Sequence, residues 1–177
     1  IMVALFMVLY YRLPGVVATV ALAVYTLLTF AFFKFVPVTL TLPGIAGFIL
    51  SIGLAVDENV LIFARIKEEF RRRGELRASL EPAFDNSWSA IRDSAIATLI
   101  TSVVLFLFGS SFGLSVIQGF ALTLGVGTVI SVFTAVVVTR SLLRLIAPLP
   151  VFNNPWLFGA TVSRPQPADA SAGPEAV

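Results

Sequence analysis

The 177-residue chain is 58% apolar and only 12% charged, and its mean hydropathy is +0.96. Soluble domains carry about 25% charged residues, so the composition excludes a soluble globular class and indicates a membrane protein. The chain has no cysteine and no histidine, which excludes disulfides, thiolate chemistry and the commonest general base. Because no nucleotide-binding loop, nucleophile elbow or zinc-type spacing occurs, we expect no enzyme activity, cofactor or metal.

Five hydrophobic segments predict an all-α, polytopic transmembrane helix bundle within residues 1–146. The segments cover residues 1–11, 16–36, 43–64, 92–108 and 118–146. A transmembrane helix needs about 20 residues, so the first segment is about half a span. We interpret it as the truncated end of a helix in a fragment of a larger protein, separated from the second segment by the turn sequence at residues 13–15. The proline-rich residues 147–177 are expected to be a tail or linker, largely disordered.

The basic residues predict the orientation of this bundle. Ten of the twelve lysines and arginines fall on one side of the predicted segments, and only Lys34 falls on the other, with Arg164 in the tail. The positive-inside rule therefore places residues 65–91 and the C-terminus in the cytoplasm. Because the basic residues cluster beside hydrophobic segments, the net charge of +2 does not indicate nucleic-acid binding.

Residues 65–91 are predicted to form a cytoplasmic helical hairpin that is broken at Gly74. Its second arm has an apolar stripe at helical spacing, formed by Leu76, Leu80, Phe84, Trp88 and Ile91. Such a stripe suits a helix that lies at the membrane interface. It equally suits a solvated connector whose second arm packs on the first, and the sequence leaves both alternatives open.

Asp57 is the candidate functional residue, because it lies inside the third apolar segment and is followed by Glu58 and Asn59. The next basic residue, Arg65, lies about 12 Å further along the helix. A charge in the hydrocarbon core costs at least about 2.5–3.5 kcal/mol, and residues that carry this cost usually move ions or protons. The alternative is a helix that ends near Ala55 and a surface helix after it, but the remaining apolar run would be too short to span.

Small residues recur every four positions in the last segment and predict close helix packing. They are Gly119, Thr123, Gly127, Ser131, Ala135 and Thr139. A shorter ridge in the third segment consists of Gly47, Ser51 and Ala55, with Asn59 next, and Gly53 lies one turn before Asp57. Such ridges can serve static packing alone. Together with an intramembrane acid, they favour an interface that moves.

Residues 53–69, GLAVDENVLIFARIKEE, resemble the fourth transmembrane helix of SecD-type proteins in the SecD/SecF family of the resistance-nodulation-division superfamily. Three later stretches share the resemblance, which extends to about residue 145: residues 90–101, residues 108–110, FGS, and residues 119–140, GFALTLGVGTVISVFTAVVVTR. It implies the second to sixth helices of such a protein, without the first helix and the large extracytoplasmic domain. The chain departs from the family pattern at Glu58, where alanine is usual, and at Ala64, where glutamate is usual.

The resemblance implies a device of the bacterial inner membrane that uses the proton gradient to assist preprotein translocation. The implied partners are a SecF-like subunit, the SecYEG channel, the preprotein and membrane lipids. Asp57 matches the intramembrane aspartate of the family and would carry the proton, with Asn59 and Glu58 as supporting polar groups. Its charge partner is expected outside this chain, because no basic residue is expected at its depth. The alternatives are another proton-coupled exporter, of small molecules or lipids, and a structural scaffold in which Asp57 only holds helices together.

Overall fold

The computed structural model describes residues 2–11, 13–36, 41–74 and 76–146, and every regular element in these ranges is helical. The elements are α1 (Met2–Tyr11), α2 (Leu13–Phe35), α3 (Leu42–Arg73), α4 (Leu76–Ser111), α5 (Ser115–Phe133), the π-helical η1 (Thr134–Thr139) and α6 (Arg140–Ile146). The predicted all-α bundle is confirmed. The predicted tail at residues 147–177 lies outside the described residues.

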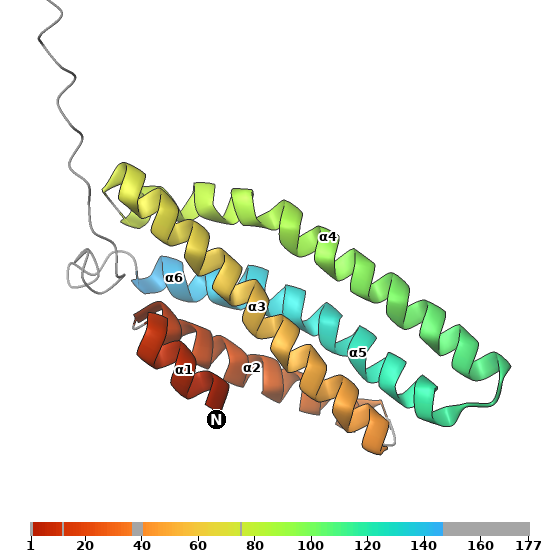
Figure 1. The fold of residues 1–177 in the computed structure, drawn as a ribbon. Coiled ribbons are helices and arrows are strands. Elements are labelled where there is room, and N and C mark those ends of the chain that lie inside the picture. Colours follow the sequence, from red (N-terminus) through yellow and green to blue (C-terminus); the bar gives the residue numbers. More distant parts are fainter. Residues whose placement is uncertain (1, 12, 37–40, 75, 147–177) are drawn as a thin grey trace, which may run out of the picture.

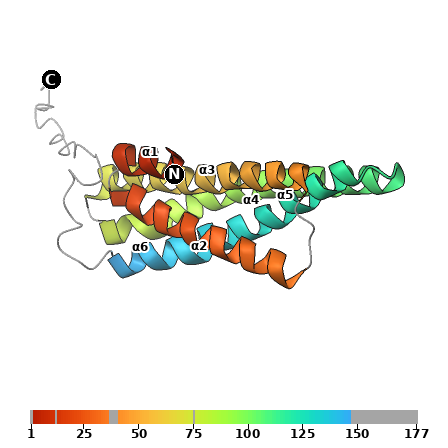
Figure 2. The same cartoon turned by 90° about the horizontal axis from the view of Figure 1, so that it is seen from below.

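Four helical runs of the described chain are long and apolar enough to cross a membrane. They are Pro14–Phe35, Leu42–Arg73, Arg77–Ser111 and Ser115–Ile146. Helix α3 packs against both α4 and α5, and α1 folds back along α2 (Figures 1 and 2). At about 1.5 Å per residue, α3 and α4 are roughly 50 Å long, so they extend well beyond a hydrocarbon core of about 30 Å.

The two arms of the predicted hairpin meet at Gly74. This residue has a φ of 74°, a left-handed conformation in which glycine has no Cβ penalty, and its N–H donates to the Phe70 carbonyl at 2.9 Å. Helix α4 then runs from Leu76 through Pro82 to Ser111 without interruption. The second arm and the fourth predicted segment are therefore one helix, and the expected boundary near residue 92 falls in its interior. The cytoplasmic location of the hairpin stays a prediction.

The apolar stripe of the second arm packs mainly inside the hairpin. Leu80, Phe84 and Ile91 are buried in one cluster with Ile62 and Ile66 of α3. Among the stripe residues whose side chains the structure describes, Trp88 alone has a large exposed fraction, 43%. The stripe therefore fits the alternative in which the second arm of the hairpin packs on the first. Trp88 remains exposed and can face lipid headgroups or another protein.

The connection between α1 and α2 differs from the expected turn at residues 13–15. Helix α2 begins at Leu13, and Pro14 occupies its first turn, where a backbone N–H has no intrahelical partner to lose. A Cβ on Gly15 would lie 2.0 Å from the Met7 carbonyl oxygen. Glycine is thus required here because the backbone of α2 touches that of α1.

Most basic residues gather at one end of the bundle. The α3–α4 turn and helix α6 lie together there, and the last turn of α2, which carries Lys34, lies toward the opposite end (Figures 1 and 2). Arg140 and Arg144 of α6 both pair with Glu81 of α4, with Arg144 Nε 3.0 Å from Glu81 Oε1. The fold thus gathers the charges as the positive-inside argument requires, whereas the side of the membrane that they face stays a prediction.

Candidate functional site

The small residues of α3 and α5 meet along one close helix contact. A Cβ on Gly47 would lie 2.4 Å from Thr123 Oγ1, and a Cβ on Gly127 would lie 2.4 Å from Ser51 Oγ. Ser51 Oγ also lies 2.7 Å from the Tyr25 hydroxyl, which ties α2 to the same contact. The two predicted ridges therefore pack against each other within this chain.

The two other predicted packing glycines differ in their surroundings. A Cβ on Gly119 would lie 2.7 Å from Thr41 Oγ1, so Gly119 belongs to the contact between α3 and α5. A Cβ on Gly53 would have no described atom within 4 Å. Gly53 therefore does not pack against a described helix, and it leaves open space one turn from Asp57.

Three consecutive polar residues of α3 point in three directions. Glu58 is only 7% exposed and faces α5, where Ser131 Oγ lies 3.1 Å from its Oε1. Asn59 is only 3% exposed, and its Oδ1 accepts a hydrogen bond from Thr139 at 2.7 Å. Asp57 is exposed and makes no hydrogen bond or ion pair with another described residue. The two buried contacts fix the rotation of α3 about its axis and aim Asp57 outward.

The π-helical segment η1 supplies the partner of Asn59. Its residue Thr139 is fully buried, and Thr139 Oγ1 lies 3.4 Å from the Thr134 carbonyl oxygen, five residues earlier. Asn59 Nδ2 in turn donates to the Ala55 carbonyl at 2.9 Å. All hydrogen-bonding groups of this amide except one donor thus have partners. Single π turns inside α-helices occur frequently at functional sites.

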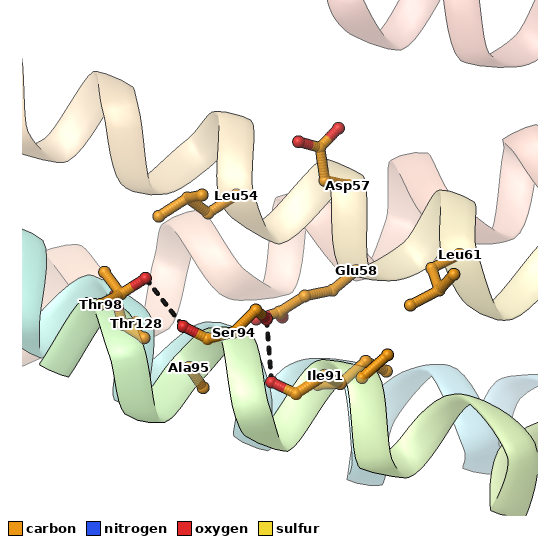
Figure 3. A pocket seen from close by; sticks show the side chains of 10 residues that line it. Leu54, Asp57, Glu58, Leu61, Ile91, Ser94, Ala95, Thr98 and Thr128 are labelled. Carbon is orange, nitrogen blue, oxygen red and sulfur yellow. Dashed lines mark hydrogen bonds between the residues drawn. The ribbon is translucent and has the colours of Figure 1, made fainter.

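A half-open pocket of about 300 Å³ lies between α3 and α4 beside these acids. Asp57 lies at its rim with the carboxylate pointing away from α4, whereas the Glu58 side chain points into the bundle (Figure 3). Ser94 and Thr98 of α4 and Thr128 of α5 also line the pocket. Both α4 hydroxyls donate to backbone carbonyls of α4 at 3.0 Å, so their oxygens can still accept hydrogen bonds from the pocket.

One basic residue of α4 is a chain neighbour of residues that line this pocket. Ile91 and Ser94 of α4 line the same pocket as Asp57, and Arg92 lies between them in the chain. Arg92 is exposed and pairs with Asp93 at 3.0 Å. The expectation that the charge partner of Asp57 lies outside this chain stays a prediction. No described cation forms an ion pair with Asp57.

Sequence reasoning identified Ser131 and Thr139 only as small ridge residues, not as the partners of Glu58 and Asn59. It also missed Tyr25, which is buried and bonded to Ser51. A tyrosine within an apolar helix is a usable signal, because its hydroxyl normally needs a hydrogen-bond partner when it is buried. No cluster of three or more potential metal ligands occurs in the part of the chain that the structure describes.

Comparison with known proteins supports one family. Residues 1–148 match the family described as "Protein export membrane protein SecD/SecF, C-terminal". The chain is 58% identical over 157 residues to the protein translocase subunit SecD of Thermobaculum terrenum. This match covers 89% of the present chain and 30% of that relative. It is 52% identical over 165 residues to SecD of a Synechocystis species, covering 92% of this chain and 34% of that protein.

The fold is also similar to a solved structure. The crystal structure of SecDF from Thermus thermophilus, described as a translocon-associated membrane protein, matches with a TM-score of 0.78 and 38% identity. The match covers 83% of this chain and 20% of SecDF. The chain thus spans about a third of the length of the two SecD relatives and a fifth of SecDF.

Proposed function

This chain belongs to the SecD/SecF family of protein export membrane proteins, and we propose that it is the membrane part of a SecD-type subunit that uses the proton gradient to assist preprotein translocation. It is a multi-pass membrane protein, with four long apolar helices in the described ranges. The proposed role is transport without enzymatic chemistry. The proposed partners are a SecF-like subunit, the SecYEG channel, the preprotein and the lipids of the bacterial inner membrane.

The main support for this proposal is the outward direction of the Asp57 side chain. Asp57 lies midway along α3. The next two residues, Glu58 and Asn59, bond to α5 and η1, and these bonds oppose a rotation of α3 that would bring Asp57 into the bundle. A carboxylate that faces hydrocarbon without a partner is costly, and a bound proton removes the charge. The side chain is therefore placed to be neutral while it faces lipid or an apolar helix and charged when it meets water or a cation.

The open space at Gly53 suits a second helix beside Asp57. Because Gly53 and Asp57 are four residues apart, they share one face of α3. We assign this face to a helix of the SecF-like partner, which would supply the group that alternates with the proton. Each proton that crosses a potential of 100 mV releases about 2.3 kcal/mol, so repeated cycles could drive movement of the partner against α3.

We further propose that residues 65–91 and the C-terminus face the cytoplasm. The supporting observation is the gathering of the basic residues at the α3–α4 turn and at α6. Anionic lipids and the membrane potential favour that end on the inner side.

The test is preprotein translocation into membrane vesicles by the full-length protein that carries this chain, with and without an imposed proton gradient. Asp57→Asn preserves the size of the side chain but cannot carry a proton. We expect the variant to insert and to assemble with its partners, and to lose the stimulation of translocation by the gradient.

The matched controls are Glu58→Gln and Glu68→Gln, on the same helix. Glu58→Gln should lose much less stimulation than Asp57→Asn, because its side chain faces α5 and not the open face. Glu68→Gln should behave like the wild type, because Glu68 is exposed and, among the described residues, forms an ion pair with Arg65 alone. Full stimulation in the Asp57→Asn protein would make Asp57 a static packing residue, and a larger loss in Glu58→Gln would mean that Glu58 carries the proton.

A further inference from the structure

Glu58 lies in a hydrogen-bond chain that is one proton short if its carboxyl group is ionised. Ser131 Oγ lies 3.1 Å from Glu58 Oε1 and 2.9 Å from the Thr128 carbonyl oxygen. A serine hydroxyl has a single proton, so it can donate to only one of these two acceptors. In the described chain, Glu58 Oε2 is buried and has no hydrogen-bond partner. An ionised Glu58 would thus have at most one donor for two charged oxygens.

We propose that Glu58 is a second proton-binding site, in which the protonated carboxyl group donates its hydrogen to Ser131 Oγ and thereby links α3 to α5. With the proton on Oε1, Glu58 donates to Ser131, and Ser131 is free to donate to the Thr128 carbonyl. Every proton in this chain of hydrogen bonds, from Glu58 through Ser131 to the Thr128 carbonyl, then has an acceptor. Oε2 becomes the carbonyl oxygen of a neutral acid, whose burial costs far less than that of a charged oxygen.

The groups around Glu58 support the neutral form. On α3, the neighbouring Asp57 is itself an acid, and a second negative charge on the same turn would be repelled. From α4, Ser94 and Thr98 face the pocket without charge, and the adjacent Arg92 and Asp93 pair with each other. These groups provide no cation to hold Glu58 as a carboxylate.

The remaining helices place no described positive charge next to Glu58. From α5, the groups nearest Glu58 are Thr128 and Ser131, which are neutral. From α2, the titratable group on the side of Glu58 is Tyr25, whose hydroxyl bonds to Ser51, whereas Lys34 lies in the last turn of α2. Among the residues that the structure describes, the surroundings of Glu58 are therefore hydroxyls, apolar groups and acids.

The two neighbouring acids would then have different roles. Asp57 points away from the bundle (Figure 3) and can exchange its proton with whatever covers that face. Glu58 retains its proton in its contact with Ser131 of α5. Retention leaves only one chargeable group on this turn of α3 and keeps α3 joined to α5. This inference rests on contacts within the chain and does not depend on the proposed role in translocation.

The test is infrared difference spectroscopy of the full-length protein in lipid nanodiscs at neutral pH. The spectrum of the wild type minus that of Glu58→Gln should show the carbonyl stretch of a protonated carboxyl group. Asp57→Asn should retain this band, and so should the surface control Glu68→Gln. If no protonated-carboxyl band disappears with Glu58→Gln, Glu58 is ionised in the protein and the proposal is wrong.

A second variant tests the assigned hydrogen bond. Ser131→Ala removes the acceptor, so the band of Glu58 should shift to higher frequency while its intensity persists. An unshifted band would show that the proton is directed elsewhere and would overturn the link to α5. Because Ser131→Ala keeps Glu58 itself, it also provides the answer if Glu58→Gln fails to fold.

Discussion

Gly127→Ala tests the closest contact between α3 and α5. The added Cβ would lie 2.5 Å from Ser51 Cβ and 2.4 Å from Ser51 Oγ. Carbon atoms pack at about 3.5–4.0 Å, so the two backbones must separate by about 1 Å. Overpacking of this kind costs about 1–3 kcal/mol. Loss of the 2.7 Å bond between Ser51 and Tyr25 adds about 0.5–1.5 kcal/mol, and alanine returns up to about 1 kcal/mol of helix propensity.

The net expectation is a loss of about 2 kcal/mol in the free energy of unfolding, within the range of these terms. The measurement is equilibrium unfolding in mixed detergent micelles, followed by circular dichroism. Gly53→Ala is the matched control, because its Cβ meets no described atom within 4 Å and should leave stability unchanged or slightly raised. Adding Ser51→Gly to Gly127→Ala removes the two closest of the contacted atoms and leaves the Tyr25 hydroxyl at 2.9 Å, so the double variant should be more stable than the sum of the single effects. Equal stability of Gly127→Ala and Gly53→Ala would refute the α3–α5 contact.

Three further predictions concern other parts of the bundle. Thr139→Val should destabilise the protein by about 1–3 kcal/mol, because the buried Asn59 oxygen loses its donor, whereas the exposed Thr101→Val should have little effect in the same unfolding assay. Glu81→Gln should weaken the attachment of α4 to α6, seen as faster hydrogen exchange in α6, and high salt should reduce the difference from the wild type because the ion pairs are exposed. Single cysteines at the exposed positions Arg77 and Ser110 of this cysteine-free chain should react with impermeant reagents from opposite sides of the membrane, and labelling from one side only would contradict the predicted orientation.

The rotation of α3 about its axis shows how much of the geometry of the site can be predicted from the sequence. A ridge of small residues at Gly47, Ser51 and Ala55 predicts one packed face, and Asn59 continues it. Because each residue turns the helix by about 100°, Asp57 lies about 200° from Asn59 and thus almost opposite that face. The outward aim of Asp57 follows once α5 is known to be the neighbour that covers the ridge. The sequence alone does not identify that neighbour, since a ridge can equally face a partner protein.

The boundaries of the helices are harder to predict from patterns of apolar residues than the rotation of α3. Charged residues such as Arg92 and Asp93 mark the edge of an apolar run, and the prediction placed a helix boundary there. The helix continues across them because Leu80, Phe84 and Ile91 pack on α3 and so stabilise the earlier turns as well. The start of α2 at Leu13 is a similar case, in which Pro14 opens a helix that the turn sequence indicated to be a loop.

The sequence by itself determined the membrane class, the apolar spans and the acid inside the third span, because these depend only on composition and spacing along the chain. It also carried the family resemblance, because that rests on the identity of residues in short stretches of sequence. Tertiary structure alone decided which of the adjacent acids is buried, that Ser131 and Thr139 meet Glu58 and Asn59, and that Thr139 is presented by a π-helical segment. These contacts join residues more than 70 positions apart. They depend on the position and rotation of α5 and η1 against α3, which are set by the packing of all the helices together.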